Sequence, residues 1–592
     1  MPKEILQKAW SLDELFPSVE SDEVNQAIEE LQVHFEEFEG YRSVLNDELE
    51  VQKLLEIFNQ YDHGIRLLSR LVGYAQLRFS EDTQDQIAQA FLGNVRQLSA
   101  ELENKTLFFN LWWKGLEDEV AEPLIKAAGD YAYWLEQMRL FKPHTLSEAE
   151  EKVINLKDVN GTQALVTLYS SITDRYTFKL KEDDEEKELT RGELSVYYFH
   201  HDPDLREASY KELYRVYGED APILGQMYQY LARDWRSEQL DLRGHSSPMG
   251  VRNLGNDIPD DVVESLLEAC KVNSSIFHRF FRLKARWIGM DKLRRYDIYA
   301  PVAKSDKTYT FNEAIEMTLD SFRQFDPRFA DLAQSIVDED HLDSEVRKGK
   351  TGGAFCATLT PDLTPWVLTS YQGQPEDVAT IAHELGHAVH SLLANHHTVF
   401  TQRASLPLAE TASTFGEMLL VDHLRALDPD PAVQRDLLFR QMDDAFKTIL
   451  RQAYFAIFER EAHDRIKQGA TVDEISELYL ENLKNQFGDS LDLSEDFRFE
   501  WVAIPHIYHT PFYVYAYAFG QLLVFSLYKQ YQQDEQEFKP RFIELLASGG
   551  SDSPVSMLER AKVDVRSPEF WQGGFDVIDG VLKELEGIEV PS

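Results

Sequence analysis

The helical spacing of apolar residues is the strongest constraint on how this chain can fold. Residues 24–45, VNQAIEELQVHFEEFEGYRSVL, place apolar side chains three or four positions apart, with charged side chains between them. Residues 85–113 follow the same rule. This period is that of an amphipathic α-helix. Because most of the chain has this character, we expect a mostly α-helical fold.

Three short segments depart from the helical pattern. Residues 174–194 contain YTFKL, an acidic turn and KELT, which predicts a small β-hairpin. Residues 295–302, RYDIYAPV, are strand-like. Residues 351–371 combine TGGAFCATL with PWVLTSY, and we expect them to form a small β-sheet beside the helix that follows. The predicted fold is therefore mostly α with little sheet.

The stretch VYYFHHDPD, at about 195–205, is the best candidate for a domain boundary. It divides the chain into residues 1–200, a helical N-terminal lobe that includes the hairpin, and residues 201–592, a larger C-terminal lobe. The chain has no fixed-period repeat and no low-complexity tract. At 592 residues it is long enough to bury a large core.

Charge excludes two classes of partner. The chain carries 103 acidic and 60 basic side chains, a net charge of −43. Such a field repels nucleic acid and anionic membranes, so we expect neither as a partner. The most apolar window, residues 512–528, is shorter than the roughly 20 residues that a membrane span needs. A buried helix explains that window better.

The two cysteines and the first residues favour a cytoplasmic protein. Cys270 and Cys356 are too few and too far apart for a disulfide framework or a cysteine zinc site. The opening residues lack a basic segment followed by an apolar one, which argues against secretion by the usual route. Cys356 has no evident base beside it in the sequence, and we do not expect it to be a nucleophile.

Five of the 17 histidines fall within residues 380–397, TIAHELGHAVHSLLANHH. On a helix from Pro375 to Asn395, His383 and His387 are one turn apart, about 6 Å along the axis, and can converge on one metal ion. Glu384 would then reach a water on that ion. HELGH is thus an example of the H-E-x-x-H pattern of zinc proteases, in which the glutamate is the general base.

The other histidines of this segment are interpreted as structural. His390 shares the face of the pair, but it stands about 10 Å from His383, too far to share an ion with Zn–N bonds of about 2.1 Å. We expect His390 to lie in the core or to contact a metal ligand without binding the ion itself. His396 and His397 fall at the helix end. Gly386 is costly inside a helix, so we expect a neighbouring helix or the substrate to approach its backbone closely.

A hydrolytic zinc site needs a third protein ligand and an open position. Residues 406–424, LPLAETASTFGEMLLVDHL, predict a second helix with carboxylates at Glu410 and Glu417, seven apart and on one face. Periodicity does not choose between them. We assign Glu410 as the third ligand and Glu417 as the acceptor of a hydrogen bond from a ligating histidine. Small residues around them would let the two helices approach closely.

The segments HELGHAVH and AETASTFGE closely resemble those of the oligoendopeptidase F group, within the thimet-oligopeptidase-like zinc peptidases of the gluzincin type. Three more segments agree, and the resemblance spans roughly residues 200–575. These are GKTGGAFC, PHIYHTPFYVYAYAFG and LLASGGSDSPVSMLERAKVDVRSPEFW.

The resemblance implies a fold, a cofactor and an activity. It implies a two-lobed helical body around a deep substrate channel, with residues 201–592 as the catalytic domain. It implies one Zn²⁺ held by His383, His387 and Glu410, and cleavage of internal bonds in short unstructured peptides. Glu384 would take a proton from the zinc-activated water and deliver it to the leaving amine.

The C-terminal segment 505–520 offers donors for the oxyanion. Its candidates are His506, Tyr508, His509, Tyr513, Tyr515 and Tyr517. If a helix starts after Pro511, Tyr513 and Tyr517 share a face and Tyr515 points away. The resemblance implies His506 and Tyr517 first, then Tyr513. This chain has Thr510 where the thimet-type branch has a tyrosine, and whether His506 or His509 faces the zinc stays open.

Gly352, Gly353 and Ala354 directly precede strand-forming residues and the histidine helix. A strand edge with small residues can bind the backbone of an extended peptide, so we assign these three to substrate binding. A plain turn is the alternative.

Two other functions remain possible on sequence alone. A carboxypeptidase of related helical architecture also uses H-E-x-x-H with a distant glutamate, but it would need a cationic pocket for the free carboxylate of its substrate. An inactive peptide-binding scaffold would not need Glu384. The segments GGSDSPVS and PEFW favour the endopeptidase.

Overall fold

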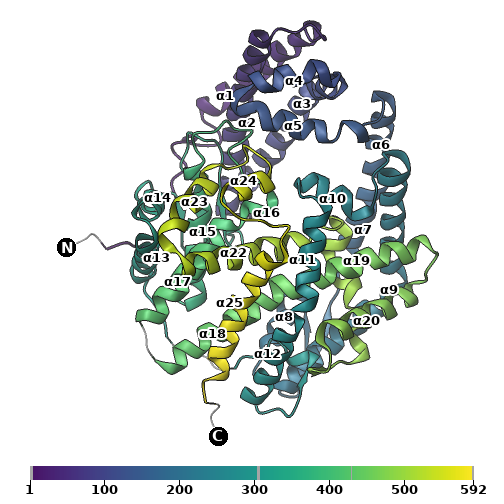
Figure 1. The fold of residues 1–592 in the computed structure, drawn as a ribbon, viewed down its shortest axis with the longest axis vertical. Helices are drawn as coiled ribbons and strands as arrows, with labels where there is room; N and C mark the ends of the chain where they lie inside the picture. Colours follow the sequence, from purple (N-terminus) through teal and green to yellow (C-terminus); the bar gives the residue numbers. More distant parts are fainter. Residues whose placement is uncertain (1–3, 303–306, 428–429, 590–592) are drawn as a thin grey trace. The chain divides into compact units, whose positions relative to one another are not determined.

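The computed structural model describes residues 4–302, 307–427 and 430–589, and α-helices make up most of it, as the helical spacing predicts (Figure 1). By packing, the chain forms two compact units, each assembled from three stretches. Unit 1 comprises Met1–Lys142, Asp306–Leu427 and Gln530–Asp564. Unit 2 comprises Pro143–Ser305, Asp428–Lys529 and Val565–Ser592. The predicted division at residue 200 follows the chain rather than this packing, and it stays a prediction.

The α-helices of unit 1 come from all three of its stretches. They are α1 (Asp22–Glu39), α2 (Val51–Glu81), α3 (Gln86–Gly115), α4 (Asp118–Ala127), α5 (Ala132–Leu140), α13 (Phe311–Phe325), α14 (Pro327–Asp338), α15 (Pro375–Leu393), α16 (Leu406–Ala409), α17 (Thr411–Leu427), α23 (Glu535–Ala547) and α24 (Pro554–Arg560).

The remaining α-helices lie in unit 2, except that α22 runs a few residues past its boundary. They are α6 (Glu148–Asn160), α7 (Thr162–Thr173), α8 (Arg191–Val196), α9 (Pro203–Trp235), α10 (Pro248–Asn256), α11 (Asp260–Val272), α12 (Ser274–Trp287), α18 (Pro431–Ala445), α19 (Arg451–Lys467), α20 (Val472–Phe487), α21 (Pro505–His509), α22 (Tyr515–Gln533) and α25 (Pro568–Glu586). Short 3₁₀ and π segments connect several of them: η1 (Gly40–Ser43), η2 (Gly129–Tyr131), η3 (Lys142–His144), η4 (Tyr197–Phe199), η5 (Arg236–Leu242), η6 (Arg295–Asp297), η7 (Phe446–Leu450) and η8 (Glu495–Ala503).

Two of the three predicted β-regions are confirmed. Strands β1 (Phe178–Glu182) and β2 (Glu185–Leu189) pair antiparallel as the predicted hairpin. Asp183 and Asp184 form its turn with φ of 51° and 65°, a conformation that aspartate tolerates better than most residues.

The second confirmed region is a three-stranded sheet in the order β4-β6-β5. Strand β4 (Leu342–Asp343) runs parallel to β6 (Trp366–Leu368), and β5 (Phe355–Ala357) is antiparallel to β6 on its other side. Strands β5 and β6 both contact α15, so the predicted sheet beside the histidine helix is present.

The strand predicted at residues 295–302 is wrong. Nearby, β3 (Leu293–Arg294) pairs with β7 (Leu491–Asp492), and residues 295–297 form the 3₁₀ turn η6. Buried ion pairs explain the difference. Asp297 is fully buried against Arg206, 2.8 Å away, and Arg295 lies 2.8 Å from Glu500. The charged residues of this stretch therefore point into the protein, where a half-exposed strand would have placed them in solvent.

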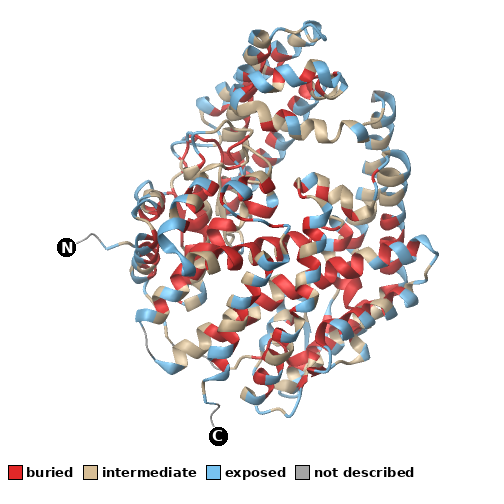
Figure 2. Ribbon diagram, in the orientation of Figure 1, coloured by how far each residue is buried: buried red, intermediate tan, exposed pale blue. Residues whose placement is uncertain are grey.

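Helix α15 begins where the sequence predicts. Gln374 and Asp377 form a reciprocal cap, in which Asp377 Oδ2 accepts the Gln374 N–H at 2.8 Å. Pro375 occupies the first turn, where its missing N–H costs nothing, and Glu376 and Asp377 add negative charge there. The buried residues of this helix lie in its middle, between Val378 and His390 (Figure 2).

Helices α15 and α17 pack closely at Gly386. A Cβ at this position would lie 2.6 Å from Ser413 Cα and 2.7 Å from the carbonyl oxygen of Ala412. Gly416 makes the reciprocal approach, since its Cβ would lie 3.2 Å from the carbonyl oxygen of Ala382. The close neighbour predicted for Gly386 is thus the backbone of α17.

The predicted single helix over residues 406–424 is interrupted. Helix α16 ends at Ala409, Glu410 has φ −86° and ψ 4°, and α17 starts at Thr411. Ser413 Oγ donates to the carbonyl oxygen of Glu410 at 3.1 Å and to its side-chain Oε2 at 2.8 Å. The break therefore holds the Glu410 carboxylate in place.

None of the helices in the described part of the chain is long and apolar enough to cross a membrane.

We predict opposite effects of alanine at two helical glycines of unit 1. Gly386→Ala should lower the free energy of unfolding by about 1–3 kcal/mol, because the new methyl group meets backbone that cannot rotate away. Gly93→Ala, in α3, is the matched control: nothing lies within 4 Å of its Cβ position. It should raise stability by up to about 1 kcal/mol through helix propensity. Denaturant unfolding measures both, and equal effects would contradict the packing at Gly386.

Candidate active site

Two histidines and a glutamate of unit 1 converge. His383 and His387 lie one turn apart on α15, and Glu410 occupies the break before α17. Glu410 Oε2 lies 3.3 Å from Nε2 of His383 and 3.3 Å from Nε2 of His387. One donor atom from each residue lies within 4.8 Å of the other two. This group of two imidazoles and a carboxylate could hold a metal ion.

Glu417, on α17, fixes the tautomer of His383. Its Oε1 lies at hydrogen-bond distance from His383 Nδ1. Because a carboxylate oxygen only accepts, the hydrogen belongs to Nδ1, and the lone pair of Nε2 then faces Glu410. Nε2 of His383 and Oε2 of Glu410, 3.3 Å apart, would repel each other as two acceptors unless a proton or a metal ion lies between them. The donor set therefore fits a metal ion, with Glu417 orienting one ligand from behind.

The electrostatics of the group favour positive charge. Burial alone lowers the pKa of His383, but hydrogen bonds to Glu410 and Glu417 outweigh burial and raise it to about 10. Burial raises the pKa of Glu410, yet its contacts with His383 and His387 hold it well below the usual range. The two carboxylates thus stabilise a cation beside these imidazoles.

Glu384 lies next to the first histidine and is only 6% exposed. Burial is the main reason that its pKa is raised, and the positive charge of neighbouring histidines opposes this only in part. A carboxylate whose pKa is shifted upwards is better suited to accept and release a proton near neutral pH.

A cavity of about 1050 Å³ connects these residues. All of its lining residues belong to unit 1, and they include His383, Glu384, His387 and Glu410. One wall is apolar and comes from α2, with Ile65 among its residues. This volume is at the upper end of the range for small-molecule sites, which suits a ligand larger than one amino acid.

Strand β5 forms another wall of this cavity. It is an edge strand, because β6 covers only one of its sides. Ala354 and the residues of β5 line the cavity, whereas Gly352 and Gly353 are exposed and lie outside the lining. Gly353 has φ +82° and turns the chain into the strand. Burial raises the pKa of the Cys356 thiol, which makes it a poor nucleophile.

The other predicted site residues form a cluster within unit 2. The rings of Tyr513 and Tyr517 are 5.1 Å apart between centroids, and His506 lies 6.0 Å from Tyr517 and 6.4 Å from Tyr513. Burial lowers the pKa of His506, which favours the neutral imidazole. That this cluster acts together with His383 and its partners stays a prediction.

Neighbouring residues of the cluster point elsewhere. Tyr515 is fully buried and its hydroxyl accepts from Asn256 at 2.8 Å, so it points away as predicted. His509 Nε2 lies 3.2 Å from Ser170 Oγ. The helix α22 starts at Tyr515, later than predicted, so Tyr513 lies in the turn before it.

The residue that holds this turn could not be recognised in the sequence. Phe512 has φ 57°, which is uncommon for a residue with a large side chain. Its N–H donates to Glu459 Oε1 at 2.8 Å, and Glu459 is fully buried on α19. Burial raises the pKa of Glu459 to about 8. In the sequence Glu459 is one of many glutamates on helices, and nothing local distinguishes it.

His390 and His397 lie among other protein groups, and the structural role of the remaining histidines of the segment stays a prediction. His390 is buried, and burial lowers its pKa to about 4. His397 lies at the end of the segment, with Nδ1 2.7 Å from Asp130 Oδ1 and Nε2 3.0 Å from the carbonyl oxygen of Ala547.

Comparison with known proteins assigns the family. The sequence profile described as Peptidase family M3 matches residues 196–577, well over half of the chain. The chain belongs to peptidase family M3. A second profile, described as Oligopeptidase F, matches residues 112–178. The family resemblance seen in the sequence is thereby confirmed.

Similar proteins cover nearly the whole chain. Oligopeptidase PepF of Bacillus subtilis is 25% identical over 98% of this chain and 87% of its own length. Group B oligopeptidase PepB of Streptococcus agalactiae is 26% identical over 98% of this chain and 96% of its own. The oligoendopeptidase-F structure from Enterococcus faecium has a TM-score of 0.72 at 22% identity and covers 95% of this chain and 98% of its own, which supports the fold.

Proposed function

We propose that the chain is a zinc-dependent endopeptidase that cuts internal bonds of short, unstructured peptides. The observation that carries this proposal is the group of His383, His387 and Glu410, with Glu384 beside it in the same cavity. Membership of peptidase family M3 supports the reaction type. The names of the similar oligopeptidases support short peptides as substrates.

His383, His387 and Glu410 would hold the ion. When bound, zinc supplies the Lewis acidity that activates water and polarises a peptide carbonyl. The Glu384 carboxylate accepts the proton of the attacking water and then donates it to the nitrogen of the leaving amine. The burial of Glu384 suits both proton transfers. It raises the pKa of the carboxylate, which lowers the free energy needed to keep Glu384 protonated between the two transfers. Glu417 keeps the proton of His383 on Nδ1.

The substrate backbone would bind along β5. An extended peptide can pair with the free edge of this strand, which gives affinity without strict sequence selection. Ala354 and β5 line the cavity, and we assign Gly352 and Gly353 to the entrance of the strand. His506 and Tyr517, with Tyr513, are our candidates for donors to the carbonyl oxygen as negative charge develops on it. This assignment requires unit 2 to act with unit 1.

We also propose that the enzyme works in the cytoplasm. Its two cysteines, Cys270 and Cys356, are free thiols, as expected in a reducing compartment.

The function is tested with an oligopeptide blocked at both ends. We expect internal cuts, mapped by mass spectrometry, that require zinc and disappear with a chelator. A carboxypeptidase would leave the blocked peptide intact and shorten an unblocked one from its C-terminus. A binding scaffold would cut neither, so absence of internal cuts contradicts the proposal.

Replacing the proposed base should separate metal binding from turnover. Glu384→Gln keeps all three ligands and nearly the same shape, so it should retain one zinc per chain. Loss of general-base catalysis should lower kcat at least about 100-fold. Metal analysis and steady-state kinetics give both quantities. Near-normal turnover in the zinc-loaded variant would remove Glu384 from the mechanism.

Replacing either of the two glutamates that contact His383 should affect zinc binding differently. Glu410→Ala leaves two protein ligands and should lose zinc during dialysis against a mild chelator. Glu417→Ala removes only the group that orients His383, which typically costs 10- to 100-fold in affinity or activity, so it should retain metal and measurable turnover. Circular dichroism confirms folding of both variants. Zinc loss from Glu417→Ala alone would show that the ligand set is wrong.

A further inference from the structure

Apart from its histidines, the described lining of the catalytic cavity contains one basic side chain. Among the residues that the structure describes, Arg403 is the only lysine or arginine in that lining, whereas three glutamates belong to it. These are Glu103, Glu384 and Glu410. Arg403 is exposed, in a chain whose net charge is −43.

Arg403 has no acidic partner among the residues that the structure describes. Its guanidinium donates to the carbonyl oxygen of Thr358, and in the described part of the chain it forms no ion pair with a carboxylate. A guanidinium has five N–H donors, so most of them stay available. Surrounding protein atoms lower its pKa, and no neighbouring charge compensates.

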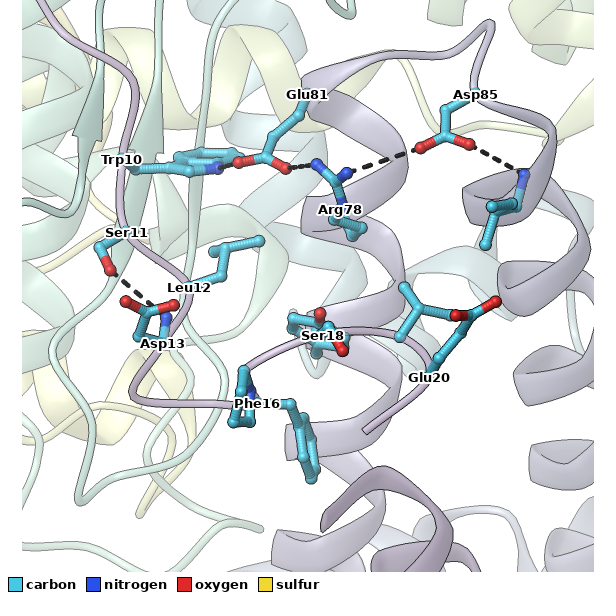
Figure 3. Close-up of a pocket in the computed structure, with 14 residues that line it drawn as sticks. Trp10, Ser11, Leu12, Asp13, Phe16, Ser18, Glu20, Arg78, Glu81 and Asp85 are labelled. Atoms are coloured by element: carbon cyan, nitrogen blue, oxygen red, sulfur yellow. Dashed lines mark hydrogen bonds and ion pairs between the residues drawn. The ribbon is translucent and has the colours of Figure 1, made fainter. Parts of the chain in front are cut away.

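In a second cavity of unit 1, an arginine of the lining is paired with carboxylates of the protein (Figure 3). There Arg78 is held between Glu81 and Asp85, and the remaining oxygen of Glu81 accepts the Trp10 indole N–H at 2.9 Å. Arg78 is therefore neutralised within the protein. Arg403 lacks such carboxylates and is exposed, so its guanidinium is available to a negatively charged group of a ligand.

Arg403 lies beside the catalytic residues. Thr358 directly follows β5, and its hydroxyl is 2.5 Å from Ser391 Oγ. Ser391 is one turn beyond His387 on α15, about 6 Å along the axis. Since one residue of an extended peptide spans about 3.3 Å, a peptide along β5 would bring Arg403 within a few residues of the bond at the metal group.

The backbone of Arg403 is fixed by the glycine pair of the LLASGGSDS segment. A Cβ at Gly550 would lie 2.2 Å from the carbonyl oxygen of Arg403, and Gly550 N–H donates to the carbonyl oxygen of Thr401 at 2.8 Å. Gly549 has φ +52°, and its Cβ would lie 2.4 Å from the carbonyl oxygen of Gln402. A larger residue at either position would displace the loop that carries Arg403, so this motif holds the arginine in place.

We propose that Arg403 binds a carboxylate of the peptide substrate, a few residues from the bond that is cut. The inference rests on the proposed peptidase function and adds the charge of the preferred substrate to it. A short peptide offers two such groups, its C-terminal carboxylate and the side chain of an aspartate or glutamate. Both would form the charge-assisted, bidentate contact for which guanidinium is suited.

The experiment compares matched peptides. One pair differs only in a free or amidated C-terminus, and further pairs exchange Glu for Gln at single positions. We expect the wild-type enzyme to cut the carboxylate member of at least one pair about tenfold faster in kcat/KM, mostly through KM. The pair that shows this preference identifies which carboxylate is bound.

Variants assign that preference to Arg403. Arg403→Gln should abolish the preference, because the kcat/KM of the carboxylate peptide falls to that of its neutral partner, and Arg403→Lys should keep part of it. Arg403→Glu should favour peptides with lysine at the same position. Arg323→Gln, which removes an exposed charge elsewhere in unit 1, should change nothing. Metal content and circular dichroism are measured for every variant.

Two results would overturn the inference while the peptidase function stands. The first is equal cleavage of all matched pairs by the wild-type enzyme. The second is an equal loss of activity towards acidic and neutral peptides in Arg403→Gln, which would mean that the arginine only supports the end of β5. If zinc-loaded wild-type enzyme cut no peptide at all, the proposed function and this inference would both fall.

Discussion

The close approach of α15 and α17 at Gly386 determines the geometry of the candidate site. With the two backbones almost in contact, side chains from α17 and from the break before it reach His383 from both sides. Glu410 lies at its Nε2 and Glu417 at its Nδ1. A wider spacing would place water between these groups and weaken the orientation of the imidazole. Gly386, the break at Glu410 and the small residues of α17 therefore act together to orient the imidazole of His383.

The packing of α15 against α17 brings carboxylates close to the two imidazoles. This negative charge explains why the site is suited to hold a cation. Glu384, Glu410 and Glu417 lie close to two imidazoles in a partly buried region. Burial lowers the pKa of His383, but Glu410 and Glu417 outweigh it and raise this pKa to about 10. Carboxylates are costly to bury unless a cation neutralises them. A divalent ion on His383, His387 and Glu410 would do so and would leave Glu384 free as a base. The arrangement is thus suited to hold a metal ion, beyond what the three donor atoms alone suggest.

The sequence predicted the features that depend on local pattern. Helical periodicity predicted α15 to within two residues, the paired aspartates marked the hairpin turn, and the spacing of His383 and His387 predicted their convergence. The resemblance to a family supplied the choice of Glu410, which periodicity left open. It also correctly indicated the family of the whole chain.

The failures involve partners that are distant along the chain. Residues 295–302 do not form a strand because Arg295 pairs with Glu500, about 200 positions away. The late start of α22 follows the left-handed Phe512, which Glu459 holds from another helix. Arg403 could not be singled out from the sequence, because the lack of a neighbouring carboxylate is evident only in the folded structure. Such long-range charge pairing has no periodic signature in the sequence.

Some residues that line the cavity lie within the segments that match the family profiles, and others lie outside them. The metal group, β5 and Arg403 fall within residues 196–577, which match the family profile. The apolar wall from α2, with Ile65, Leu68 and Val72, falls outside both matched segments. In the proposed function the first set performs hydrolysis and binds the backbone and charge of a peptide. The α2 wall contacts side chains, where burial of apolar surface is worth about 25 cal/mol per Å². Differences in side-chain preference from other members of the family should therefore arise mainly from α2, while the reaction itself depends on the segments that the family shares.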